Sequence, residues 1–141
     1  MKKSSSFIIV GILLATLIAA AAYRCGTLTS QQDQQPVEIM SVSGPLAPIN
    51  PGGPVVEVTL KNVSSEPVVS LTATLNAGSY FGFAFDVSAA NPLMRGKSIS
   101  SRVTMIGGGF DDTLLYPLTV NGTLKSGGKF NFTKQVKIQA P

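Results

Sequence analysis

The chain has 141 residues, of which 44% are hydrophobic and 13% are charged, and it contains no histidine and no tryptophan. This length favours one domain, and the low share of charged residues is typical of an all-β extracytoplasmic domain. The net charge is +4, but from residue 37 onward eight basic residues face six acidic ones and are scattered, which argues against a nucleic-acid-binding protein.

The N-terminal segment has the layout of a secretory signal. Lys2 and Lys3 precede an uncharged run at 7–23, FIIVGILLATLIAAAAY, which ends in small residues. A charged start, an apolar core and a small-residue end are the three regions of a signal peptide, and Ala20 and Ala22 satisfy the small-x-small rule for cleavage. A signal peptide cut after Ala22 is the first of two interpretations.

An uncleaved anchor is the second interpretation of residues 1–24. The 17 residues of the run 7–23 would span about 25 Å as a helix, which is near the lower limit for crossing a bilayer core, so the membrane is their predicted partner. In either case the basic start favours a cytoplasmic N-terminus and a domain outside the membrane. A lipid anchor on Cys25 is disfavoured, because Arg24 occupies the place where bacterial lipidation sites have a small residue.

A polar linker at 25–36 separates this segment from a domain at 37–141. In the domain, apolar residues alternate with polar ones between turn-forming residues, which predicts about seven strands with one face toward a core. The first predicted strand is 37–43, and the Pro/Gly-rich segment 44–54 is a predicted loop. The side chains predicted to point inward are Val56, Val58, Leu60, Val69, Leu71, Ala73, Leu75, Phe81, Phe83, Phe85, Val87, Ile99, Val103, Met105, Leu114, Tyr116, Leu118, Val120, Leu124, Phe130, Phe132, Val136 and Ile138.

Strands that are apolar on one side are buried when two sheets pack face to face. We therefore predict an antiparallel β-sandwich, with a closed barrel as the alternative. The Ser126–Gly128 segment supplies a hairpin turn. The stripe formed by Phe81, Phe83 and Phe85 is expected in the core rather than in an exposed partner-binding patch.

Asp112 stands four residues before Tyr116, and Leu118 follows two residues after it. This spacing resembles the tyrosine corner of immunoglobulin domains, in which a cysteine occupies the place of Leu118. The departure agrees with a chain whose only cysteine lies outside the predicted domain. The resemblance implies that Asp112 and Tyr116 are structural, with the tyrosine at the core edge and its hydroxyl bonded to nearby backbone.

More broadly, residues 54–139 resemble the Ig-like sandwich modules of prokaryotic cell-surface proteins. The resemblance depends on VEVTLKNVSSEPVVSLTATL, NPLMRGKSIS and YPLTVNGTLKSGGKFNF. It implies an all-β, Ig-like antiparallel β-sandwich of about seven strands, preceded by the N-terminal hydrophobic helix. Such modules serve as spacers, adhesion units or binding platforms.

Few residues of the domain suggest chemistry. Asp111 and Asp112, with Asp86 if the loops converge, are candidate calcium ligands, although calcium requires six to eight oxygens. No phosphate loop, zinc set or other cofactor site is predicted, and the lack of histidine and of a domain cysteine argues against an enzyme. The sequons at Asn62, Asn121 and Asn131 are compatible with glycosylation, although chance is the favoured explanation.

The predicted function is therefore that of a membrane-anchored or secreted extracytoplasmic domain. Its role would be structural, or binding to an unknown protein or cell-envelope partner, without catalysis and without nucleic acid. The alternative is a surface-assembly subunit in which residues 37–43 complete a neighbour's sheet, and the loop 44–54 would permit that exchange. A small hydrolase with a Ser-Lys dyad or a carboxylate pair is a remote third possibility.

Overall fold

The computed structural model describes residues 34–46, 54–105 and 110–140, and within them all regular structure is β-strand. None of these described residues belongs to a helix with the length and hydropathy needed to cross a bilayer. The predictions about the hydrophobic segment, Ala20, Ala22 and Cys25 fall outside the described residues. The strands, in chain order, are β1 (Val37–Leu46), β2 (Val55–Asn62), β3 (Val68–Asn76), β4 (Tyr80–Ala84), β5 (Ser98–Thr104), β6 (Leu115–Leu124) and β7 (Lys129–Lys137).

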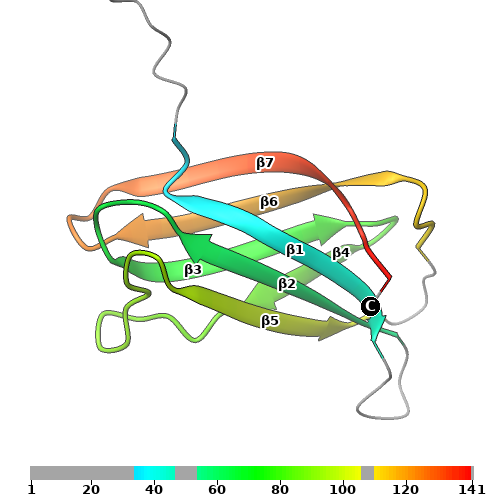
Figure 1. Cartoon of the computed structure of the whole chain (residues 1–141), viewed down its shortest axis with the longest axis horizontal. Helices are drawn as coiled ribbons and strands as arrows, with labels where there is room; N and C mark the ends of the chain where they lie inside the picture. The colour runs from blue at the N-terminus through cyan, green and yellow to red at the C-terminus, as the bar shows by residue number, and fades with distance from the viewer. Residues whose placement is uncertain (1–33, 47–53, 106–109, 141) are drawn as a thin grey trace, which may run out of the picture. The chain divides into compact units, whose positions relative to one another are not determined.

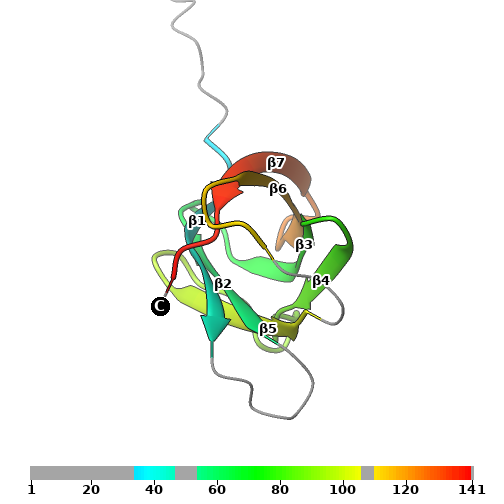
Figure 2. The ribbon, with the colours of Figure 1, turned by 90° about the vertical axis from the view of Figure 1, so that its right-hand side faces the viewer.

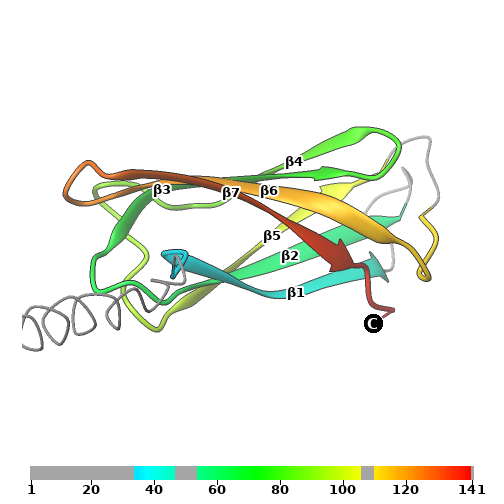
Figure 3. The same ribbon diagram turned by 90° about the horizontal axis from the view of Figure 1, so that it is seen from above.

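The seven strands form two antiparallel sheets that lie face to face (Figures 1 and 3). One sheet has three strands in the order β1-β2-β5, and the other has four in the order β4-β3-β6-β7. The order follows from sequence only in part, because β3 pairs with β6 across two intervening strands. The prediction of about seven strands in two antiparallel sheets is confirmed.

The core fills the space between the sheets because the strands alternate buried and exposed side chains. In β2 the buried residues include Val56, Val58 and Leu60, and in β4 the phenylalanines at 81 and 83 are buried while their neighbours are exposed. The core position of the phenylalanine stripe is thereby confirmed, since Phe85 is also buried. Several further predicted inward residues are partly buried against this core, namely Val87, Ile99, Val103, Tyr116, Leu124, Phe130 and Phe132.

Two predicted core positions are wrong. Val69 is only half-buried and Val68 is buried instead, because the β3–β6 register shifts between Val68 and Ser70. An extra residue at such a bulge reverses the face that the next side chain takes. Leu114 is 53% exposed because β6 begins after it, and its amide donates to the Asp111 carbonyl in a turn.

The first strand lies in the sheet of its own chain and pairs with β2 from Val37 to Leu46. It is longer than the predicted 37–43, because Gly44 is not a loop residue: its amide donates to the Gln139 carbonyl at 2.8 Å. The Gln139 amide in turn donates to the Val42 carbonyl at 2.9 Å. The segment after β7 therefore runs beside β1 and ties the two sheets together at this edge (Figure 2).

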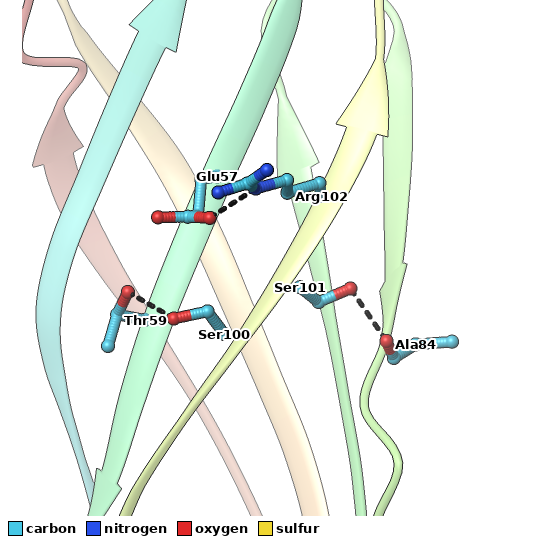
Figure 4. A network of polar contacts seen from close by, with 6 residues as sticks. All are labelled: Glu57, Thr59, Ala84, Ser100, Ser101 and Arg102. Carbon is cyan, nitrogen blue, oxygen red and sulfur yellow. Dashed lines mark hydrogen bonds and ion pairs between the residues drawn. The ribbon is translucent and has the colours of Figure 1, made fainter. Parts of the chain in front are cut away.

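The opposite edge of the sandwich is tied by a side chain. The Ser101 hydroxyl of β5 donates to the Ala84 carbonyl of β4 at 2.6 Å (Figure 4). The β6–β7 hairpin closes at the predicted turn, where Gly127 adopts a φ of 91° and the Leu124 amide donates to the Gly128 carbonyl at 2.8 Å. A positive φ favours glycine at this position.

Asn62, at the end of β2, is the fully buried polar side chain of the described core. Its amide nitrogen donates to the carbonyl of Glu66 at 2.9 Å and to that of Leu93 at 2.8 Å. Its side-chain oxygen accepts from the Ser64 amide at 2.9 Å and the Ser64 hydroxyl at 2.8 Å. The Asn62 amide thus joins the loop after β2 to the segment before β5, and this sequon residue has a structural role.

Candidate functional site

The outer face of the four-stranded sheet carries small polar side chains in rows that cross the strands. Because alternate residues of a strand point to opposite sides, the buried Leu71, Ala73 and Leu75 leave Thr72 and Thr74 facing outward. We call the following nine residues the polar face: the row Thr74, Thr119 and Thr133, the row Thr72, Asn121 and Asn131, and the row Ser70, Thr123 and Lys129.

Hydrogen bonds link β6 to β7 along this face. The hydroxyls of Thr119 and Thr133 lie 2.8 Å apart, and the Asn131 side-chain amide donates to the side-chain oxygen of Asn121. A hydroxyl offers one donor and two acceptor sites and a primary amide offers two donors, so these pairs retain bonding capacity. The polar face can therefore exchange hydrogen bonds with a ligand while its own side chains stay ordered.

A hollow of about 350 Å³ lies on the polar face and is lined by its second and third rows together with Gly122 and Phe130. Its shape depends on Gly122. A Cβ at this position would meet the ring of Phe130 and would lie 2.8 Å from the Ser70 carbonyl oxygen. The glycine therefore lets the Phe130 ring lie against β6 on the core side of the sheet, behind a hollow whose outward side chains supply hydroxyl, amide and ammonium groups.

The two sheets differ in charge. The strands of the four-stranded sheet contain Lys129, Lys134 and Lys137 and no aspartate or glutamate. Within the described residues none of these lysines forms an ion pair. The four-stranded sheet is therefore cationic.

The outer face of the three-stranded sheet pairs its polar groups with one another (Figure 4). Arg102 of β5 and Glu57 of β2 form an ion pair, and the hydroxyls of Thr59 and Ser100 lie 2.8 Å apart. These pairs neutralise the face internally. Of the two sheets, the four-stranded one carries the charge that a partner can complement.

A second hollow, of about 200 Å³, lies between β1 and β7. It is lined by residues 39–42 of β1, residues 134–137 of β7 and Gln139. Met40, which is 51% exposed, gives it an apolar side, and Lys134 and Lys137 give it a basic one. This hollow marks the edge at which β1 and β7 separate before the bonds between Gln139 and β1 join them.

The structure does not gather the three candidate calcium ligands. Among the described residues no group of three or more Asp, Glu, His or Cys side chains is placed to hold a metal ion. Asp111 instead accepts hydrogen bonds from the Thr113 hydroxyl and from the Thr113 amide, the latter at 2.8 Å. These bonds hold the pKa of the Asp111 carboxyl below its ordinary value. Asp86 and Asp112 have exposed side chains.

Tyr116 is half-buried against the core, and its hydroxyl bonds the backbone of Asp111. The hydroxyl accepts from the Asp111 amide at 2.7 Å and donates to the Asp111 carbonyl at 3.1 Å. The bonded residue stands five positions before the tyrosine, one further than Asp112. Asp111 therefore organises this turn, and its signal in the sequence is the Asp-x-Thr pattern of an Asx turn.

The sequons Asn121 and Asn131 are cross-strand neighbours on the polar face. In the sequence the two sequons are separate positions, and no pattern there reveals that they lie in one row with Thr72. Counting outward from the Ser126–Gly128 turn would have paired the two asparagines, but no local signal places β3 beside β6.

The polar face provides hydrogen-bond donors and acceptors and a cationic group around an open hollow. Such a set binds a polar ligand and orients it, whereas chemistry would need an activated nucleophile or base. No protein-family model matches the chain, and no curated protein matches it.

Proposed function

We propose that the chain is a non-catalytic, Ig-like binding module displayed outside the cytoplasmic membrane, and that the polar face is its binding surface. The basic start and the apolar run at 7–23 support export, either as a cleaved signal or as an anchor. The polar residues 25–36 would then hold the domain clear of the membrane.

The strand order supports the Ig-like assignment. In constant-type immunoglobulin domains the first, second, fifth and fourth strands share one sheet, and the third, sixth and seventh share the other. This chain has the same division except that β4 pairs with β3. The bonds between the Tyr116 hydroxyl and the backbone before β6 support the same assignment, because the corner tyrosine of Ig domains bonds backbone at that place.

The observation that carries the binding role is the contrast between the two outer faces. The four-stranded sheet has a hollow of about 350 Å³ lined by Lys129, which forms no ion pair among the described residues, while the three-stranded sheet pairs Glu57 with Arg102. Ligand sites are concave and use a few polar groups to orient the ligand. The hollow around Thr72, Asn121 and Lys129 shares these two features, but it is open rather than enclosed.

A non-catalytic role agrees with the titratable groups of the described residues. Active sites hold groups whose pKa values are shifted by burial or by charged neighbours inside a cleft. The pKa of the Asp111 carboxyl is lowered, but this group is exposed and bonded within its own turn rather than placed in a cleft. The lysine in the hollow, Lys129, is also exposed.

The strand-exchange alternative has less support. It requires residues 37–43 to leave their own sheet, and β1 pairs with β2 along its length and with Gln139 at its end. We therefore assign β1 to the module's own sandwich.

Two measurements test the proposal. Mass spectrometry of the natively expressed chain from fractionated cells is expected to show a mature start at Tyr23 in the exported fraction, or an intact Met1 in the membrane. Retention of the purified full chain on cell envelopes tests the face itself. Thr72→Glu, which places an anion in the hollow, should abolish retention, whereas Thr104→Glu on exposed β5 should leave it unchanged. Equal retention of both variants, or a cytoplasmic chain, would overturn the proposal.

A further inference from the structure

We infer that the ligand of the polar face is an acidic polysaccharide, that is, an extended chain of sugar units carrying carboxylate groups. The inference rests on the proposed function, because it assigns a ligand class to the same face.

The polar face repeats in two directions, as an extended ligand requires. Neighbouring strands lie about 4.8 Å apart, and successive outward residues along a strand are about 6.7 Å apart. The three rows across β3, β6 and β7 therefore present hydroxyl and amide groups at short, regular intervals. A sugar chain offers hydroxyls in a comparable repeat, and each can both donate to and accept from a Ser, Thr or Asn side chain.

The hollow is open, and the face continues beyond it. Lys129 and Lys137 are eight positions apart in β7, so they share a side of the strand and are separated by about 26 Å. A ligand that follows the strand over this distance must contain several sugar units. The open site thus differs from the enclosed pocket that surrounds a single small molecule.

The charge of the face favours an anion. Lys129 lines the hollow, and the strands of this sheet contain no acid to neutralise it. Lys137 is partly compensated, since its charge contributes to the lowered pKa of Asp111. Lys129 is therefore the principal cation for a carboxylate at the hollow.

The side chains favour a sugar over a protein or a nucleic acid. Protein interfaces depend on large apolar or aromatic anchors. None of the nine residues of the polar face is of that kind, although the exposed Leu115 pairs with Lys137 further along the same sheet. Nucleic-acid sites need many basic contacts to phosphates, whereas this hollow contains one lysine and no arginine. The hydroxyls and amides of the polar face suit a ligand that is itself rich in hydroxyls.

The test compares three probes on the purified full chain by affinity electrophoresis and titration calorimetry. Polygalacturonate is an acidic polysaccharide, dextran is a neutral one, and polyglutamate is a carboxylate polymer without sugar. We expect polygalacturonate to bind at least tenfold more tightly than either of the others, with an affinity that falls as salt is added. If polyglutamate bound as tightly as polygalacturonate, the face would be a general polyanion site. If dextran bound as tightly, charge would have no role. Either result would overturn the inference.

Matched variants locate the binding. Lys129→Gln should weaken polygalacturonate binding by up to about fivefold and leave the weak binding of dextran unchanged. Thr72→Val, which removes one hydroxyl at constant shape, should weaken both. Lys97→Gln, at an exposed position before β5, is the control and should change neither. Circular dichroism confirms that each variant is folded.

The two proposals fail in different ways. A chain that is retained on envelopes in a Thr72-dependent manner but ignores polygalacturonate would refute the ligand class and preserve the binding face. A chain that is neither retained on envelopes nor bound by polygalacturonate would refute both the binding face and the ligand class.

Discussion

Replacing Asn62 by aspartate removes two hydrogen-bond donors from the core without changing the size of the side chain. The carboxylate would face the carbonyls of Glu66 and Leu93, which lie 2.9 and 2.8 Å from the amide nitrogen that it replaces. Each carbonyl keeps another donor, because the Ser64 hydroxyl donates to the Glu66 carbonyl at 2.6 Å and the Val68 amide donates to the Leu93 carbonyl at 3.0 Å. Losing the two Asn62 hydrogen bonds therefore costs about 1–3 kcal/mol, from about 0.5–1.5 kcal/mol each, before the cost of burying a carboxylate is added. That is a substantial part of the free energy of unfolding of about 5–15 kcal/mol that is typical of a domain.

The loss of unfolding free energy in the Asn62→Asp variant should increase as the pH rises. We expect burial beside two carbonyls to raise the pKa of the new carboxyl above its unfolded value of about 3.9, by more than the two Ser64 donors to its other oxygen lower it. Well below pH 4 the carboxyl is protonated in both states and donates to one carbonyl, which roughly halves the deficit. As pH rises above 4, only the unfolded state releases the proton, so the variant loses about 1.4 kcal/mol per pH unit until the folded-state pKa is reached.

Urea denaturation followed by far-ultraviolet circular dichroism measures this effect against the wild type at pH 4 and at pH 8. The control is Asn91→Asp, because the exposed Asn91 amide donates one bond, to the Asp86 carbonyl at 3.1 Å, and its loss should cost less than about 1 kcal/mol. If the Asn62 variant is unfolded at pH 8, acidification to pH 4 should refold it. A deficit below about 1 kcal/mol, or one that is equal at both pH values, would refute the structural role of Asn62.

Three further predictions concern stability. Gly122→Ala should destabilise the chain by about 1–3 kcal/mol, because the added methyl group meets the Phe130 ring. Gly82→Ala is the control, because a methyl group there meets open space and should not destabilise the chain. Equal urea midpoints for the two variants would contradict this prediction. Tyr116→Phe should cost about 0.5–1.5 kcal/mol in urea denaturation by removing the hydroxyl bonds to Asp111, and an unchanged midpoint would mean that the corner contributes nothing. Asp111→Ala should lower stability at pH 7 but not at pH 2. A carboxyl whose pKa is lowered in the folded state stabilises the fold above its unfolded pKa and loses that contribution as the pH falls. A loss of stability that persists at pH 2 would refute the role of the Asp111 charge.

The sequence was sufficient to predict the strands and most of their buried faces. Val56, Val58 and Leu60 in β2 illustrate the reason: where one side of a strand is buried, a period of two is enforced residue by residue. The same logic identified the hairpin turn at Ser126–Gly128, since a tight turn depends on local residues. The predictions failed at Val69 and Leu114, where a bulge and a turn decide which side of the strand a residue takes.

Only the tertiary structure decided which outward side chains lie next to one another. Thr72 and Asn121 belong to strands separated by β4 and β5 in sequence, and their pairing is set by the packing of the whole core rather than by any local pattern. The same holds for Asn62, whose partner Leu93 comes from a distant segment. Polar residues on a strand surface are visible in the sequence, but a binding face exists only once non-local pairing has fixed the register of the strands that carry it.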